Sequence, residues 1–409
     1  MQLYILAGKK YAKANADVNH YDLIGVIDES ESVLWNKKFN DAGECEIYIP
    51  CNKEILSLLR SGNYVYRYDD DMFCKIGKFE IKTDVENGDY IIAPAPDICN
   101  ILSNRIVRWQ IVFSGTVGQF IKKLLTDNVI NPAQTHRAIP NFVFDESNLA
   151  EFSDKIEVSA FTNDLLQTII STCKTFKIGF RVSYDIETRK LVFRLKKGRN
   201  KASAAGGEYV EFSPSFANIL SSHYIEDDTE YKNVVYVGYK SANKDDNTTY
   251  LYSYPPNEND ISGEDRCEIY VDGTNISRDI TLDELRVMFP DVKNEGNGYV
   301  ATIDGKLTAV ALSDTSGSEE KITVTDTTYF MLIRAIAEQT LAERVEKQSF
   351  EGDVDTVDTY KYKVDYDIGD IVNVKNEYGL EAEAQITEVM ESDDAEDGYA
   401  IEPKFEYLN

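Results

Sequence analysis

The stretch YKVDYDIGDIVNVKNEYGLEAEAQITEVM, which runs from Tyr362 to Met390, is the part of the chain that best indicates its fold. Apolar residues recur at every second position, and Gly and Asp interrupt the runs. This spacing predicts an extended strand, a tight turn at 368–370, a second strand at 371–374 and, after a polar turn at 376–379, a return strand. Alternating strands joined by short turns are typical of a small antiparallel barrel or sandwich.

The turn at 368–370 is expected to be scaffold. Gly369 would supply the backbone conformation that the turn needs, and Asp370 would provide its hydrogen bonds. A hairpin of this kind carries no chemistry of its own, so it indicates the fold and not an activity.

The first hundred residues show the same period. Two alternating runs, 33–39 and 45–49, flank a polar turn at 40–43, which predicts a hairpin. A short helix is expected at 53–59. Further strands are expected at 24–27, 64–68, 74–82 and 90–93. We therefore predict a first β-domain over residues 1–100.

The segment 101–205 changes to a helical period. Thr116-x-x-Gln119 is a capping box, which predicts the start of a helix. A second helix is expected from Thr162, because apolar residues recur on one face as far as Cys173. Strands at 178–184 and 191–197 follow. Two amphipathic helices with hairpins predict an α+β domain.

A second β-domain is predicted from residues 206–271 together with 321–409. Its strongest strand is Tyr231–Tyr239, with which later strands at 251–254 and 267–271 can pair. The hairpin at 362–390 completes this domain.

Two helices interrupt the strands of this C-terminal half. One long helix is expected at Thr327–Lys347, with Val345 on its inward face. Residues 272–320 break the strand pattern, although Thr281-x-x-Glu284 would cap a short helix there. We interpret 272–320 as an insertion.

Composition limits the classes of function. The 409 residues suffice for two to four domains, and 43% hydrophobic residues suffice for real cores. A formal charge of -28 argues against binding nucleic acid by neutralising its phosphates, because the complementary positive field is missing. No signal peptide, membrane span or membrane anchor is recognisable, so a soluble protein is expected.

The chain contains no recognisable catalytic motif. Its three histidines, His20, His136 and His223, share no local motif with another His, a Cys or a nucleophilic Ser. Six cysteines occur without a CxxC pair, so free thiols in a reducing cytoplasm are expected. Acidic runs at 69–71, 227–228 and 392–394 lack the spacing of a calcium loop, and we interpret them as solvated turns. We therefore predict no catalytic residue, no cofactor and no metal site, and no enzyme.

Several blocks, in this order and spacing, resemble the siphophage tail proteins of the ReqiPepy type. The blocks are YDLIGVIDESESVLWNKKFNDAGECEIYIP (21–50), ILSNRIV (101–107), EFSPSFANILSSHYIEDDTEYKNVVYVGY (211–239), DRCEIYVD (265–272) and IGDIVNV (368–374). Only the insertion at 272–320 lies outside the resemblance.

The resemblance implies the architecture of a phage tail hub: α+β and β-rich, with two tube-like β-barrel domains separated by an α+β domain. It also implies a homotrimer whose six similar barrels face a hexameric tail tube. Partners would be the distal tail protein or tail tube protein, the tape measure protein, and a tail fibre or spike. Genomic DNA would pass through the lumen without specific binding. Since the chain ends at Asn409, we expect no fused lytic or receptor-binding domain.

The expected function is thus a structural baseplate or tail-tip hub in the virion, synthesised in the cytoplasm of a bacterial host. The alternative is a receptor- or carbohydrate-binding tail-tip protein, for which the tyrosines at 64, 66 and 68 are the only feature. A cell-wall hydrolase is a third hypothesis without any motif. The acidity suggests a negative lumen, because cationic walls would retain DNA phosphates.

Overall fold

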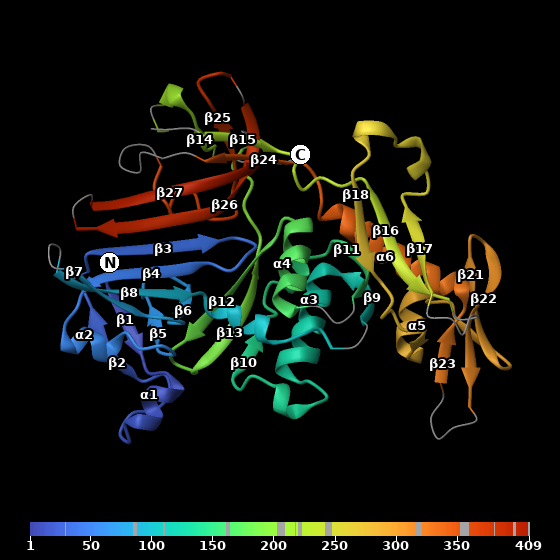
Figure 1. The fold of residues 1–409 in the computed structure, drawn as a ribbon, viewed down its shortest axis with the longest axis horizontal. Coiled ribbons are helices and arrows are strands. Elements are labelled where there is room, and N and C mark those ends of the chain that lie inside the picture. The colour runs from blue at the N-terminus through green and yellow to red at the C-terminus, as the bar shows by residue number, and fades with distance from the viewer. Residues whose placement is uncertain are drawn as a thin grey trace.

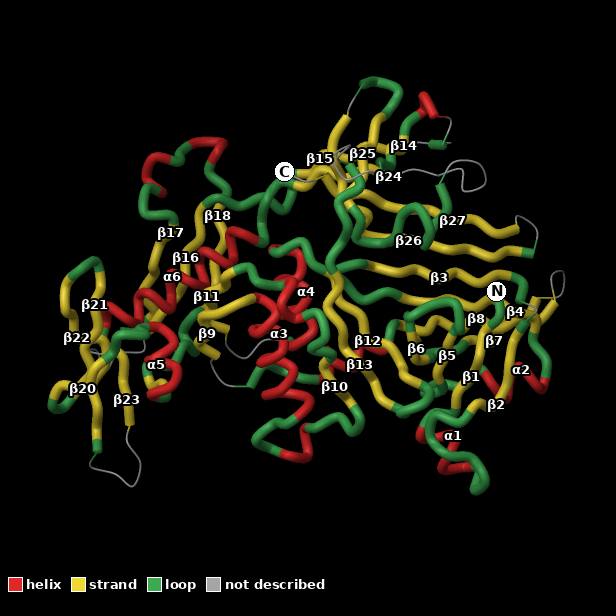
Figure 2. The backbone as a smooth tube through the Cα atoms, turned by 180° about the vertical axis from the view of Figure 1, so that it is seen from behind, coloured by secondary structure: helices red, strands yellow, loops and turns green. Residues whose placement is uncertain are grey.

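The computed structural model describes the chain except residues 29, 85–87, 109–110, 161–163, 203–208, 217, 220–222, 242–247, 316–320, 352–359, 380, 396–397 and 408–409. It is β-rich, with 43% strand and 23% helix, which confirms the predicted class. Figures 1 and 2 show three regions along the long axis. The N- and C-terminal strands lie at one end, helices α3 and α4 in the middle, and strands β16 to β23 at the other end.

The N-terminal region opens with a four-stranded sheet in the order β2-β1-β5-β6. Its elements are β1 (Leu3–Leu6), α1 (Lys9–Ala14), β2 (Leu23–Ile27), α2 (Lys53–Leu58), β5 (Tyr64–Tyr66) and β6 (Phe73–Lys75). Apolar side chains of this sheet and of its neighbour meet in one hydrophobic core, which includes Leu3, Trp35 and Ile47.

The largest sheet has ten strands and combines both ends of the chain. Its path runs β15-β24-β27-β26-β3-β4-β8-β7, and β25 pairs with both β26 and β14. The strands are β3 (Ser32–Lys38), β4 (Glu44–Pro50), β7 (Glu80–Asp84), β8 (Gly88–Pro96), β14 (Glu211–Phe212), β15 (His223–Asp227), β24 (Lys347–Glu351), β25 (Ile371–Lys375), β26 (Glu381–Asp394) and β27 (Gly398–Tyr407).

The two ends of the chain are joined where β26 pairs antiparallel with β3. The register runs from Glu388 opposite Lys38 to Asp394 opposite Ser32. Figure 1 shows the red strands β26 and β27 beside the blue strands β3 and β4. In the described residues no sheet closes on itself, so the predicted pair of barrels stays a prediction.

The hairpin predicted at 371–390 is confirmed as β25 and β26. The strand predicted before it is wrong. Tyr362 and Tyr366 meet in an isolated bridge, and Lys363 between them has a φ of 66°. The Lys363 N–H donates to the Tyr366 carbonyl at 2.7 Å, so this stretch is a compact turn.

The middle region is the α+β unit. It contains η1 (Ile98–Asn104), β9 (Ile111–Thr116), α3 (Val117–Leu125), the π-helical turn η2 (Thr126–Ile130), η3 (Thr135–Arg137), β10 (Phe142–Phe144), η4 (Leu149–Glu151), β11 (Lys155–Ala160), α4 (Leu165–Thr175), β12 (Gly179–Asp185) and β13 (Lys190–Lys196). The capping box of Thr116 and Gln119 is confirmed. Asp164 caps α4, and the predicted start at Thr162 lies outside the described residues.

The third region follows the 3-10 turn η6 (Pro214–Phe216). Its elements are β16 (Val234–Lys240), β17 (Thr249–Tyr254), the 3-10 turns η7 (Glu258–Asp260) and η8 (Gly263–Asp265), β18 (Glu268–Asp272), β19 (Asp279–Ile280), α5 (Leu282–Met288), β20 (Lys293–Glu295), β21 (Gly298–Ile303), β22 (Lys306–Asp314), β23 (Lys321–Val324) and α6 (Asp326–Ala342). β16 pairs with β17 and β18, as expected. Side chains from α5 and β21–β23 pack in the same hydrophobic cluster as β16 and α6.

The long helix is shorter than the sequence pattern predicts. α6 ends at Ala342, and Val345, expected to face inward, is 53% exposed. The Lys232 N–H donates to the Arg344 carbonyl at 2.9 Å, and Lys347 begins β24. Pairing with distant strands therefore ends the helix early.

Candidate functional site

A cluster of buried charges lies where β26 meets β3. This junction cluster consists of Lys37, Arg67, Asp70, Lys363 and Glu391. Lys37 Nζ lies 2.6 Å from Asp70 Oδ2 and 3.3 Å from a Glu391 oxygen. Arg67 Nη2 lies 3.1 Å from Glu391, and Lys363 Nζ lies 2.9 Å from Asp70. The cluster thereby connects the N-terminal strands to the C-terminal ones.

Most of these side chains are withdrawn from solvent. Lys37 and Arg67 are each 3% exposed, and Glu391 is 1% exposed. Burial by itself would raise the pKa of Asp70, but the charges of Lys37 and Lys363 outweigh it and hold that pKa far below its ordinary value. Buried charges of this kind are tolerated only when each has a partner, so the cluster fixes the relative position of the strands that carry it.

Aromatic rings complete the surroundings of the cluster. Lys37 Nζ lies 4.7 Å from the centre of the Tyr362 ring, and the Arg67 guanidinium lies 5.2 Å from the Trp35 ring. Tyr399 donates a hydrogen bond of 2.7 Å to Glu391. The rings exclude water while their faces interact favourably with the cations.

A second buried ion pair attaches the α+β unit. Arg181 on β12 donates to Asp97 Oδ2 at 2.7 Å and to the Lys38 carbonyl at 3.2 Å. Asp97 also caps η1 by accepting the Cys99 N–H at 2.8 Å. The N-terminal strands, the C-terminal hairpin and the α+β unit are thus connected by buried polar contacts around one junction.

The turn at Gly369 lies in the same junction, and its predicted roles are confirmed. Gly369 has a φ of +93°, and a Cβ there would lie 2.1 Å from the Phe39 ring. Asp370 accepts the Arg199 N–H at 2.9 Å, the Arg199 Nη2 at 2.6 Å and the Asp367 N–H at 2.9 Å.

Sequence reasoning missed the junction cluster, although one signal was present. In β3 the buried positions Val33 and Trp35 are followed at the same period by Lys37, a charged residue on an inward face. The interpretation of 69–71 as a solvated turn is wrong for Asp70, which is 9% exposed and paired.

The features considered for other functions are not brought together. His20 lies between α1 and β2, His136 in η3 and His223 in β15. Tyr64 is 5% exposed and stacks on Phe73, so only Tyr68 of the three alternating tyrosines is largely exposed. No group of three His, Cys, Asp or Glu side chains that could hold a metal occurs among the residues that the structure describes.

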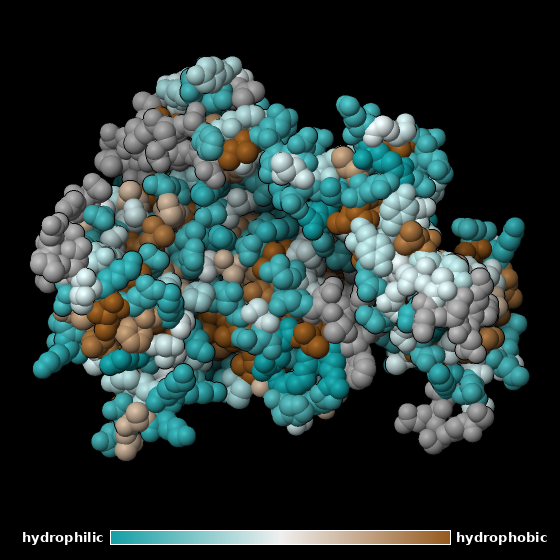
Figure 3. Space-filling view, viewed as in Figure 1, coloured by the Kyte–Doolittle hydropathy of each residue, from teal (hydrophilic) through white to brown (hydrophobic). Residues whose placement is uncertain are grey.

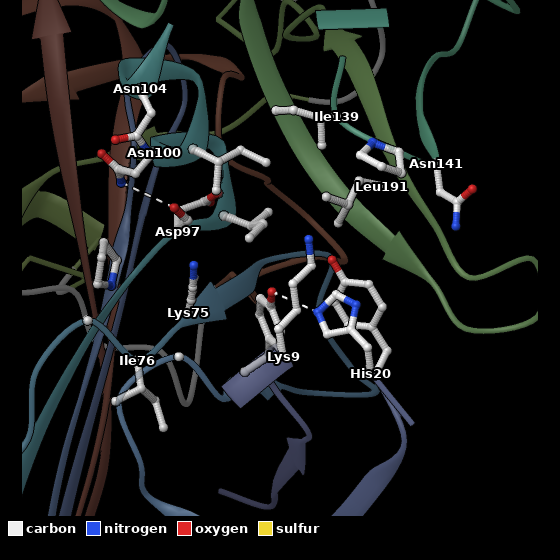
Figure 4. A pocket seen from close by; sticks show the side chains of 18 of the residues that line it. Lys9, His20, Lys75, Ile76, Asp97, Asn100, Asn104, Ile139, Asn141 and Leu191 are labelled. Atoms are coloured by element: carbon white, nitrogen blue, oxygen red, sulfur yellow. Dashed lines mark hydrogen bonds between the residues drawn. The ribbon is translucent and has the colours of Figure 1, made fainter. Parts of the chain in front are cut away.

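A cleft of about 840 Å³ separates the four-stranded N-terminal sheet from the α+β unit. Figure 4 shows Lys9, His20 and Lys75 on one side of it, and Ile139 and Leu191 on the other. We call it the basic cleft, after the five lysines and arginines that line it. These are Lys9, Lys10, Lys75, Arg105 and Arg189.

Outside the cleft the surface shown in Figure 3 is mostly hydrophilic, with small hydrophobic patches between the polar residues. In the described part of the chain, no helix combines the length and apolar character that crossing a membrane requires.

Comparison with known proteins gives one extensive match. The model of the family described as siphovirus ReqiPepy6 Gp37-like protein matches residues 18–405. No curated protein matches the chain.

Solved structures share a weaker likeness. A tail protein from Neisseria meningitidis MC58 is 13% identical, with 99% of this chain and 95% of that chain covered and a TM-score of 0.45. The 43 kDa tail protein of prophage MuSo2 from Shewanella oneidensis is 10% identical, with 99% and 98% covered and a TM-score of 0.46. Prophage tail protein gp18 from Listeria monocytogenes EGD-e is 12% identical, with 99% and 94% covered and a TM-score of 0.43. The assignment of the chain rests on the family match alone.

Proposed function

Because the chain belongs to the siphovirus ReqiPepy6 Gp37-like family of tail proteins, we propose that it is the hub that joins the tail tube to the tail tip. The observation that carries the proposal is the extent of the match, which includes residues 18–405 and therefore every region of the fold. A structural role in the phage tail follows from the family. The hub, its ring and its partners are our inference.

The buried contacts of the junction support a role as a rigid scaffold. One sheet of ten strands contains both ends of the chain, and the junction cluster with the Arg181–Asp97 pair holds it against the α+β unit. Such a scaffold resists relative movement of its parts, because separating them would leave buried charges unpaired. Rigidity of this kind suits a component that holds the tail tube and the tail tip in a fixed relative position.

In the proposed assembly three copies form a ring. Each copy contributes two tube-like β regions, so that six similar surfaces face the hexameric tube. The distal tail or tail tube protein would bind above, and the tape measure protein and a fibre or spike would contact the ring from inside or below. DNA would pass through the lumen without specific binding. The formal charge of -28 per chain favours an acidic lumen wall, which would not retain phosphates.

The mass of the purified chain tests the ring. We expect light scattering during size exclusion to give three times the protomer mass of 46.3 kDa, and class averages in electron microscopy to show a threefold ring. A monomer that persists in the presence of the tube protein would contradict the hub. A trimer whose lumen wall is net basic would contradict the proposed acidic channel but not the proposed ring.

Two further assays separate the other functions. Binding of the isolated protein to host cells or glycans would favour the receptor-binding alternative, and loss of turbidity of host cell walls would favour a hydrolase. The domain division at 1–100, 101–205, 206–271 with 321–409, and the insertion at 272–320, stays a proposal that limited proteolysis can test.

A further inference from the structure

The basic cleft is lined mainly by positive charges, whereas the chain as a whole has a negative formal charge. Its five lysines and arginines come from α1, from β6, from the residue after η1 and from the turn between β12 and β13. Asp97 is the one carboxylate among the lining residues, and Arg181 already neutralises it at 2.7 Å. In a chain with a formal charge of -28, such a concentration of positive charge needs an explanation.

Three of the cations are available to a ligand. Arg189 is paired with Asp22 at 2.9 Å, and Arg105 donates to the Arg137 carbonyl at 3.0 Å. Within the described residues, no carboxylate lies at ion-pair distance from Lys9, Lys10 or Lys75. The first two of these lysines are exposed, and Lys75 is half-buried.

His20 lies within the positive field of these lysines. His20 lines the cleft, and its Nε2 lies 3.2 Å from the Tyr64 hydroxyl. Burial, together with the charges of Lys9 and Lys75, lowers the pKa of His20 to about 4. Protonating His20 therefore adds a charge to a place that already has an excess of positive charge.

The walls of the cleft are not those of a simple anion site. Half-buried Ile101 and Ile139 and exposed Pro140 supply apolar surface. Asn104 and Asn141 are exposed at its edge and can donate hydrogen bonds. A volume of about 840 Å³ far exceeds that of one phosphate or carboxylate, and the mixture of cations and apolar walls suits a chain with both acidic and apolar side chains.

We propose that the basic cleft binds an acidic peptide segment of a partner protein, with carboxylates placed at Lys9, Lys10 and Lys75. Apolar side chains of the peptide would pack against the exposed surface of Ile101, Ile139 and Pro140. Charge complementarity identifies the occupant, since the rest of this acidic surface would repel such a segment. The proposal goes beyond the hub function and does not depend on ring formation.

Fluorescence anisotropy of the full chain tests the proposal. The probe is a short labelled peptide in which Glu alternates with Leu, and its control is the same peptide with Gln in place of Glu. We expect the Glu peptide to bind in a salt-sensitive manner, and the double variant Lys9→Gln/Lys75→Gln to bind it about tenfold more weakly or worse. Lys53→Gln/Lys306→Gln removes the same charge from exposed lysines elsewhere and should bind like the wild type.

The imidazole of His20 supplies a readout that does not rely on affinity. The chain has only three histidines, so His20→Gln assigns its signal in an NMR titration. We expect the pKa of His20 to rise when the Glu peptide binds, because the carboxylates offset the field of the two lysines. Equal circular dichroism spectra for all variants would establish that they fold.

Several outcomes would overturn the inference. One is equal binding of the Gln and Glu peptides, and another is an equal loss in both lysine variants, which would indicate diffuse attraction. If inorganic phosphate displaces the peptide and shifts His20 equally well, the cleft is a small-anion site and not a peptide site. None of these readouts involves the oligomeric state, so failure of the ring and failure of the cleft are distinguishable.

Discussion

Lys37 Nζ donates a hydrogen bond of 2.6 Å to Asp70 Oδ2, and both side chains are almost completely withdrawn from solvent. The bond connects β3 to the loop between β5 and β6, and Lys363 reaches the same carboxylate from the C-terminal half of the chain. Without Lys37, each of the two buried carboxylates would keep one cation, Lys363 beside Asp70 and Arg67 beside Glu391, but would lose a charged partner in a buried site.

Lys37→Met should therefore destabilise the protein by about 1.5–3 kcal/mol, because Asp70 and Glu391 lose their shared cation while each keeps one other. Urea unfolding measures the change. Lys375→Met is the matched control, since its pair with Glu381 is exposed on both sides and should contribute less than about 1 kcal/mol. Equal stability of the two variants would contradict the role of the cluster.

Gly369→Ala should cost about 3 kcal/mol or more, since the new Cβ would collide with Phe39 in a backbone conformation with φ of +93°. Gly379→Ala provides the comparison. Its φ is +85°, but no described atom lies within 4 Å of the added Cβ, so only the backbone strain of about 1 kcal/mol remains. Thermal or urea unfolding gives the stability of the two variants. The difference between their losses is the cost of the collision with Phe39, since both share the backbone strain. A cost at Gly369 no larger than at Gly379 would disprove the packing account.

Stability should depend on pH through His20. Unfolded His20 takes up a proton near pH 6.5, whereas the folded pKa is about 4, so acidification between these values favours the unfolded chain. Relative to His20→Gln, the wild type should lose about 1 kcal/mol between about pH 7 and pH 5, a figure reduced for partial solvent screening. Denaturant titrations of both proteins give this difference directly. A difference independent of pH would contradict the lowered pKa of His20.

Thiol labelling should divide the cysteines into two groups. All six are free, and Cys45, Cys74, Cys99 and Cys173 are buried. Burial raises the pKa of each of these four thiols well above its ordinary value, which removes the reactive thiolate. With a soluble disulfide reagent, mass spectrometry should find Cys51 and Cys267 modified first, and the other four only after unfolding. Rapid native labelling of Cys173 would contradict the packing around α4.

Short-range features could be predicted well from the sequence. The β25–β26 hairpin, the roles of Gly369 and Asp370, and the capping boxes at Thr116 and Thr281 depend on residues a few positions apart. The extent of α6 could not be predicted in the same way. Its periodicity continues to Val345, but the bond from Lys232 and the start of β24 end the helix at Ala342.

By itself, the sequence determined the local elements and, through the order of its blocks, the family, because period, turn chemistry and caps are properties of neighbouring residues. Only the tertiary structure decided that β26 pairs with β3, and that Arg67 and Glu391, which are 324 residues apart, share a buried ion pair. The same holds for the basic cleft, which α1, β6 and the β12–β13 turn form only together. Strand edges and charges find partners through the free energy of the whole fold, and a local pattern does not specify which distant partner that is.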